Sequence, residues 1–127
     1  MSESRLVGVV PIALLPFEQD GRVDFDSLGR GLDFLVESGV SWVGFGFGSE
    51  VFRLTEEEVD EVFRFTNGHC KGKLSIIANV RAGSARAAVL RAQAAAGARA
   101  VMMPLPQYAT VPQGELVSLY RAVVDGS

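Results

Sequence analysis

The residues with the clearest capacity for chemistry form a glycine-rich stretch, Gly44-Phe45-Gly46-Phe47-Gly48-Ser49-Glu50. It follows a short apolar run, and its three alternating glycines let backbone N–H groups approach a bound group closely. Clustered N–H groups of this kind bind small anions, so a carboxylate or a phosphate is the expected guest. Glycines that only relieve crowding in a closed sheet would give the same pattern. The stretch by itself leaves both interpretations open.

Four further side chains are candidates for roles around this stretch. Arg81 follows an apolar run and suits an anionic substrate group, although a surface arginine is the plainer interpretation, and Arg53 is similar. Tyr108 can donate a hydrogen bond to a substrate, but the prolines around it also suit a rigid loop in which it only packs. We expect Glu50 to brace the glycine stretch by accepting backbone hydrogen bonds.

The two lysines, Lys71 and Lys73, are poor candidates for covalent chemistry. They lie in a polar connection that precedes an apolar run, which places them at the opposite end of the expected sheet from the glycine stretch. An amine that attacks a carbonyl needs burial or a cationic neighbour to lower its pKa. We therefore expect both lysines to be solvated and no catalytic residue among them.

His69 is the single histidine and neighbours the single cysteine, Cys70. Adjacent residues rarely present their side chains to each other, and the pair lies on the connection away from the glycine stretch. Neither a second histidine nor a second cysteine is available, so no metal and no other cofactor is expected. A lone cysteine cannot form an internal disulfide, which favours a reducing, cytoplasmic setting.

Composition limits the class of protein. The chain has 127 residues, 48% of them hydrophobic and 21% charged, as in one globular domain. A net charge of -3 gives no general reason to bind nucleic acid or an anionic membrane. The apolar run at residues 6–15 is too short to span a bilayer and lacks a basic leader, so we expect a buried strand over residues 6–14 instead of a signal peptide.

Apolar runs and helix signals alternate along the chain. Strands are expected to open near residues 6, 41, 74 and 99. Helices are expected to follow them, each with a start signal at a capping residue or a proline and the first three with a stop signal at a glycine. Those signals are Asp24 and Gly39, Thr55 and Asn67-Gly68, Ser84 and Gly97, and Pro112 for the last helix.

A spacing of roughly 30 residues per unit is what a right-handed βαβ crossover requires, so the pattern predicts an α/β fold of four βα units. Two architectures share this pattern: an open doubly wound sheet, and half of a (β/α)₈ TIM barrel. Both bind ligands where strands end and helices begin. Phe17, the glycine stretch, Arg81 and the loop at residues 104–108 should then lie on one face.

Several segments together carry a family resemblance. They are Ala13-Leu14-Leu15-Pro16-Phe17, residues 35–40, Gly46–Glu50 with residues 54–58, Ile76-Ile77-Ala78, and Met103-Pro104 with Gln113-Gly114. In this order and spacing the chain resembles the N-terminal half of the dihydrodipicolinate synthase / N-acetylneuraminate lyase family. The resemblance covers essentially all of residues 1–127 and implies the N-terminal (βα)₄ portion of a TIM-barrel lyase domain.

The resemblance implies a role for the glycine stretch. Its residues from Gly46 to Glu50 occupy the family's Gly-Thr-Thr-Gly-Glu motif, whose threonines hold a keto-acid carboxylate through hydroxyl and N–H groups. Here those positions are Phe47 and Gly48, so both hydroxyls are lost, and Ser49 offers a hydroxyl one position late. The expected substrate-binding residues are thus Phe47, Gly48 and Ser49, with Arg81 and Tyr108.

The same resemblance implies a pyruvate-type lyase, aldolase or dehydratase that works through a Schiff base. The family's catalytic tyrosine and Schiff-base lysine lie on the fifth and sixth strands, beyond these four units, so this chain alone is expected to be inactive. A small 2-keto acid is the implied partner, with assembly into a homo-oligomer. The alternatives are a non-enzymatic half-barrel for binding or assembly, and a doubly wound phosphate-binding domain.

Overall fold

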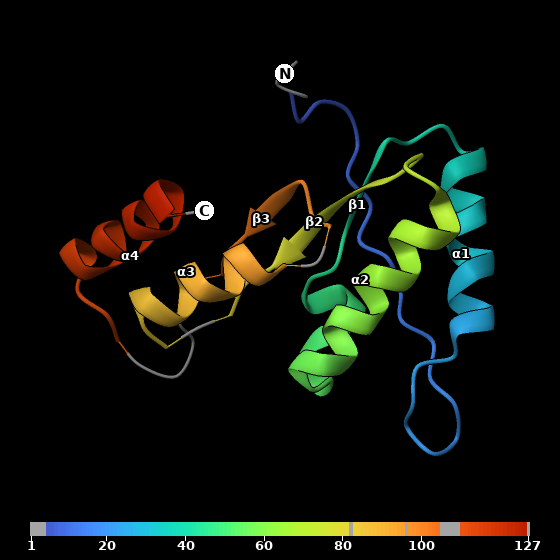
Figure 1. Ribbon diagram of the computed structural model, residues 1–127, viewed down its shortest axis with the longest axis horizontal. Coiled ribbons are helices and arrows are strands. Elements are labelled where there is room, and N and C mark those ends of the chain that lie inside the picture. The colour runs from blue at the N-terminus through green and yellow to red at the C-terminus, as the bar shows by residue number, and fades with distance from the viewer. Residues whose placement is uncertain (1–4, 82, 96, 105–109, 127) are drawn as a thin grey trace.

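The computed structural model describes residues 5–81, 83–95, 97–104 and 110–126. Helices alternate with short strands along the chain, and four helices flank a small sheet (Figure 1). The helices are α1 (Phe25–Glu37), α2 (Glu56–Cys70), α3 (Ala85–Ala94) and α4 (Gln113–Gly126). The strands are β1 (Trp42–Gly44), β2 (Ser75–Asn79) and β3 (Ala100–Met102), and two 3₁₀ turns, η1 (Phe47–Ser49) and η2 (Val51–Arg53), follow β1.

The strands are parallel and are added in chain order. β2 pairs with β1 on one side and with β3 on the other. The segment before α1 lies on the outer side of β1, where Ile12 forms a parallel bridge with Gly44. In the doubly wound alternative the first strand would lie beside both the second and the third, so this progressive order favours the half-barrel.

The prediction of a buried first strand over residues 6–14 is wrong in its extent and its burial. Pairing is limited to the contact with Gly44, whose carbonyl accepts from the Ala13 N–H at 2.9 Å and whose N–H donates to the Pro11 carbonyl at 2.9 Å. Gly8 has a φ of 91°, which breaks the extended backbone. Because the described chain places no strand on its other side, this segment leaves large apolar side chains exposed: Leu6, Val7, Val9, Ile12 and Leu14.

The sheet has one face covered by helices. Alternate residues of the strands belong to a core cluster with buried side chains from α1 and α2. They are Val43 of β1, Phe45 just after β1, and Ile76 and Ala78 of β2. A second cluster joins Val80 to α3 and α4, so each half of the sheet has its own helix pair. Side chains at the intervening positions point to the opposite, inner face of the sheet.

That inner face is strongly curved. The Cε of Met102 on β3 lies 3.4 Å from where a Cβ would stand on Gly44 of β1, although β2 runs between these strands. In a flat sheet, next-nearest strands are roughly 9.5 Å apart, farther than a methionine side chain reaches. The contact therefore requires the curvature of a barrel wall.

The predicted helix starts are confirmed. The Asp24 side chain accepts from the Ser27 N–H, and Thr55 and Glu58 form a reciprocal capping box at the start of α2. The predicted end of α2 at Asn67-Gly68 is wrong, because the helix continues to Cys70 and closes on Lys71, a left-handed residue with φ 49°. Exposed Gly68 is tolerated inside the helix because core contacts of neighbouring turns outweigh its low helix propensity.

Candidate functional site

The glycine stretch forms a compact double turn at the carboxyl end of β1. Gly46 is extended, and the chain then folds into η1, where the Ser49 N–H donates to the Gly46 carbonyl at 3.0 Å. Glu50 is left-handed with φ 58° and joins η1 to η2, since its N–H donates to Phe47 and its carbonyl accepts from Arg53. The turn is therefore held by its own backbone, and a defined set of N–H groups faces outward.

Phe47 and Gly48 present the N–H groups that remain available. Both residues are exposed, and within the described chain no hydrogen bond leaves either N–H. The first N–H groups of a helical turn lack a carbonyl one turn earlier. The carbonyl of Gly44, three residues before Phe47, is already occupied by the Ala13 N–H. These two neighbouring donors suit a carboxylate oxygen.

Ser49 holds the turn in place. Its side chain is 1% exposed, and its hydroxyl donates to the Ala13 carbonyl and accepts from the Gly46 N–H at 3.4 Å. Both functions of the hydroxyl are thereby used inside the protein. The structure thus gives Ser49 a bracing role, which the sequence assigned to Glu50.

Glu50 does not brace the stretch through its carboxylate. That carboxylate lies 3.3 Å from the Arg53 Nε, with both side chains largely exposed. Its contribution comes instead from its left-handed backbone, which links the two turns. The expectation of backbone hydrogen bonds to the Glu50 side chain is wrong, because the left-handed turn directs that side chain outward to the neighbouring arginine.

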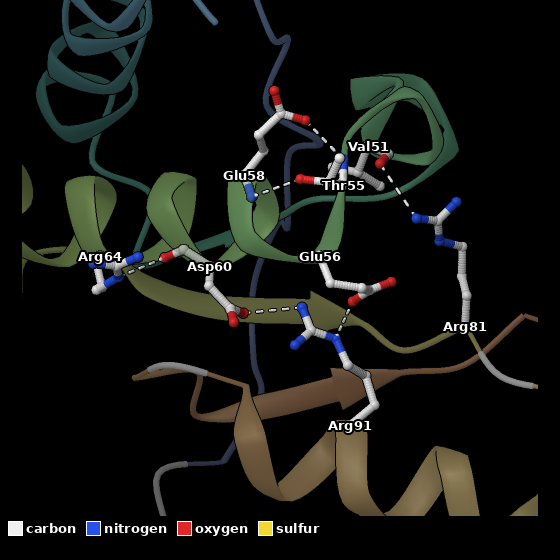
Figure 2. Close-up of polar contacts among 8 residues, drawn as sticks. All are labelled: Val51, Thr55, Glu56, Glu58, Asp60, Arg64, Arg81 and Arg91. Carbon is white, nitrogen blue, oxygen red and sulfur yellow. Dashed lines mark hydrogen bonds and ion pairs between the residues drawn. The ribbon is translucent and has the colours of Figure 1, made fainter.

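Arg81 follows β2 and reaches back to the double turn, where its Nη2 donates to the Val51 carbonyl at 3.4 Å (Figure 2). This places a cation beside η2, at the same end of the sheet as Phe47 and Gly48. Tyr108 lies outside the described residues. A different phenol, Tyr120 of α4, donates to the Met103 carbonyl at 2.7 Å and fixes the helix to the end of β3.

Arg91 is a structural residue that the sequence did not single out. From α3 it contacts two acidic side chains of α2, Glu56 at 2.5 Å and Asp60 at 2.9 Å (Figure 2). Its side chain is only 18% exposed, so the contacts are partly shielded from water. These ion pairs could not be predicted from the sequence, because Arg91 lies 31 residues after Asp60 and meets its partners only when α3 packs beside α2.

The residues at the other end of the sheet behave as structural groups. His69 Nε2 lies 2.8 Å from Asp33 Oδ1 of α1, and its ring stacks on Phe65. Cys70 is buried, and burial followed by the negative charge of Asp33 raises the pKa of its thiol. Lys71 and Lys73 are exposed beside it. Among the described residues, no three His, Cys, Asp or Glu side chains gather to hold a metal ion.

Asn79 is a further residue that the sequence did not reveal. It ends β2 on the inner face, and its Nδ2 lies 3.7 Å from where a Cβ would stand on Gly46. Its Oδ1 is buried, and within the described part of the chain it has no hydrogen-bond partner. The sequence alone does not indicate that an asparagine in an apolar run lies on the inner face, because only the strand register reveals which face it occupies.

Comparison with known proteins agrees with this geometry. The sequence profile of the dihydrodipicolinate synthetase family matches residues 5–127. The chain belongs to this family. It is 28% identical over 130 residues to the 4-hydroxy-tetrahydrodipicolinate synthase of Phocaeicola vulgatus, covering all of this chain and 44% of the relative. The corresponding enzyme of Methylococcus capsulatus is 34% identical over 121 residues, with 93% and 42% covered.

Solved structures of the family share the fold. A dihydrodipicolinate synthetase of Pseudomonas aeruginosa superposes with a TM-score of 0.86 at 32% identity, over 94% of this chain and 42% of that one. YagE of Escherichia coli K12, solved in complex with pyruvate, gives 0.87 at 26% identity, over 96% and 42%. This dihydrodipicolinate synthetase family chain thus spans less than half the length of the relatives, and its four βα units are half of a (β/α)₈ barrel. None of the described helices is long and apolar enough to cross a membrane.

Proposed function

We propose that this chain supplies the carboxylate-binding half of a family lyase that acts on a 2-keto acid of the pyruvate type. One observation carries the proposal: the N–H groups of the adjacent residues Phe47 and Gly48, at the carboxyl end of β1, make no hydrogen bond within the described chain. TIM-barrel active sites lie at this end of the strands. Pyruvate bound to the relative YagE supports the same class of ligand.

In this proposal each residue has a separate task. Phe47 and Gly48 donate to the carboxylate, and Ser49 holds their turn against the Ala13 carbonyl. Arg81 adds a positive charge at the same end of the sheet, and Tyr108 is proposed to donate from the loop after β3. The reacting amine of the Schiff base comes from the remaining part of a barrel, because Lys71 and Lys73 lie exposed at the opposite end.

The first experiment follows backbone amide shifts of the isotope-labelled chain during titration with pyruvate. The amides of Phe47 and Gly48 should shift most, because they donate to the carboxylate. Methyl pyruvate is the matched control, since it keeps the ketone and masks the charge, and it should leave these amides unmoved. Equal shifts with both compounds would contradict carboxylate binding.

The second experiment tests the location of the covalent chemistry. The chain is incubated with pyruvate and borohydride, which traps a Schiff base as a stable amine, and its mass is measured. We expect the mass to stay unchanged, because neither lysine is placed near the keto-acid site. A trapped adduct on Lys71 or Lys73 would overturn this assignment.

A second candidate function, an assembly module, is favoured by the two open sides of the half-barrel. An apolar hollow of about 670 Å³ lies between the segment preceding α1, α1 itself and the glycine stretch. At the far side, α4 leaves Val117 and Val124 exposed. A second copy would cover both sides, giving a homo-oligomer whose barrel contains two halves.

A further inference from the structure

The Asn79 side chain occupies an unusual place. It belongs to β2, on the face opposite the buried Ile76 and Ala78, and so points into the concave side of the sheet. Its Nδ2 and the Cε of Met102 both lie over the α-carbon of Gly46, at 3.7 and 3.1 Å from a Cβ placed there. Gly46 directly precedes Phe47 and Gly48, whose N–H groups make no hydrogen bond to the residues that the structure describes.

The described residues around this amide are apolar and leave its oxygen without a hydrogen bond. Its Oδ1 is buried and has no hydrogen-bond partner among the residues that the structure describes. The nearest strand neighbours on the same face are Ile77 and Met102, which are apolar. A buried acceptor without a hydrogen-bond donor destabilises the folded state by roughly the solvation free energy that the acceptor loses on burial. Such a cost is typical of positions that meet a ligand.

We propose that Asn79 is a specificity-determining residue, whose amide accepts a hydrogen bond from a hydroxyl group on the carbon chain of a bound 2-keto acid. This inference rests on the proposed function, because the carboxylate of the same ligand is held by Phe47 and Gly48. An Oδ1 acceptor is satisfied by an O–H donor and not by a second carboxylate. The favoured substrates are therefore hydroxylated 2-keto acids.

The amide can serve a hydroxyl group in both directions. Its Oδ1 accepts the hydroxyl proton, and its Nδ2 donates to the hydroxyl oxygen. A site built to hydrogen-bond a hydroxyl discriminates against the analogue that lacks it, because the buried polar group is then left unpaired. Pyruvate itself would bind through its carboxylate and leave Asn79 unsatisfied.

The test compares pyruvate with hydroxypyruvate in amide-shift titrations of the labelled chain. Hydroxypyruvate should bind about three- to tenfold more tightly, the range expected of one net hydrogen bond, and should shift the Asn79 side-chain amide. In Asn79→Leu the two affinities should become equal while the Phe47 and Gly48 shifts with pyruvate persist. Ser75→Ala, on the same face at the other end of β2, is the control and should keep the preference.

The outcomes separate this inference from the proposed function. Equal affinities in the parent chain, with Phe47 and Gly48 still shifted, overturn the role of Asn79 and leave carboxylate binding intact. Loss of all shifts overturns both. Thermal unfolding adds an independent measurement: Asn79→Leu should raise Tm, since it removes an unpaired acceptor. A lower Tm would mean that the amide has a structural partner, and would overturn the proposal.

Discussion

At the scale of single residues, the most informative side chain is Ser49. Its buried hydroxyl joins the glycine stretch to the segment before α1 by donating to the Ala13 carbonyl, and it accepts from the Gly46 N–H within the stretch. Ser49→Ala leaves the Ala13 carbonyl and the Gly46 N–H without that partner, so we expect a loss of about 1–3 kcal/mol in the free energy of unfolding. Urea denaturation measures this loss.

Ser118→Ala is the matched control for this serine. Its hydroxyl also donates to a backbone carbonyl, that of Gly114 at 2.9 Å, but on the exposed surface of α4. Its removal should change stability by less than about 0.5 kcal/mol. Equal effects of the two substitutions would show that burial of Ser49 contributes nothing.

Asp24 gives the fold a dependence on pH. The Ser27 hydroxyl, and next the Ser27 N–H, lower the pKa of this carboxyl from its ordinary value of 3.8. A carboxyl whose pKa is lower in the folded state stabilises the fold above its unfolded pKa, and this stabilisation is lost as pH falls through the folded pKa. The difference in unfolding free energy between the parent and Asp24→Asn should therefore be constant near neutral pH and shrink below about pH 4.

Urea denaturation at a series of pH values measures that difference. Asparagine keeps a capping oxygen, so the comparison isolates the charge. Ser27→Ala removes the largest cause of the lowered pKa and should reduce the pH-dependent part. A difference that stays constant down to about pH 3 would show that Asp24 titrates alike in both states.

What sequence could predict about single residues depended on how local their partners were. Thr55 and Asp24 find their partners within three residues, and both caps were predicted correctly. Ser49 bonds to a carbonyl 36 residues away, and Asn79 faces Gly46 across a strand pair. Such contacts arise only from tertiary packing. The binding roles of Phe47, Gly48, Ser49, Arg81 and Tyr108 stay predictions.

At the scale of elements, the contact between α2 and α3 rests on Arg91. Its guanidinium bonds to Glu56 and Asp60 while its stem is mostly covered. Arg91→Met keeps the apolar stem and removes the charge, so we expect a loss of about 1–3 kcal/mol in the free energy of unfolding. The loss should shrink as salt rises from about 0.1 M to about 1 M.

Arg22→Met is the comparison for this arginine. Arg22 also contacts a carboxylate, that of Asp20 at 2.7 Å, but its side chain is 78% exposed. Surface pairs contribute little, so this variant should unfold as the parent does. If Arg91→Met lowers the free energy of unfolding by no more than Arg22→Met does, or by an amount that does not depend on salt, then Arg91 does not join α2 and α3 through partly buried ion pairs.

The boundaries of helices and strands also depend on tertiary packing that the sequence does not reveal. The four helices and the later three strands were predicted from periodicity and capping signals. The first strand was predicted wrongly, because the apolar run at residues 6–14 indicates burial only when neighbours cover it on both sides. The end of α2 was also misplaced, since Asn67-Gly68 looks like a stop signal while Cys70 of the next turn is buried in the core.

At the scale of the whole molecule, the open sides decide how the chain behaves in solution. Leu14 and Phe34 are 77% and 67% exposed and line the apolar hollow beside α1. Exposed apolar patches promote association. Sedimentation of the isolated chain should therefore show species larger than one copy, increasing with concentration.

Replacing both side chains, Leu14→Lys with Phe34→Lys, should shift the sedimentation profile towards single copies. Leu90→Lys is the control, because Leu90 is half exposed on α3 and does not line the hollow. A dimer of one discrete size would favour the assembly module, and polydisperse aggregates would count against it. A parent chain that sediments as single copies at all concentrations would contradict association through these sides.

The contact of Met102 with Gly44 of β1 and with Gly46 just after it has a consequence for how this protein can change over generations. Ile12 and Met102 fill the space that Gly44 and Gly46 leave empty. The side chains of neighbouring strands therefore fill one common space in this part of the sheet. If a glycine is replaced by a larger residue, a neighbouring side chain must become smaller. Drift at these four positions is constrained jointly: an alanine at Gly46 becomes tolerable when Met102 has first become smaller, and the order of the two substitutions matters.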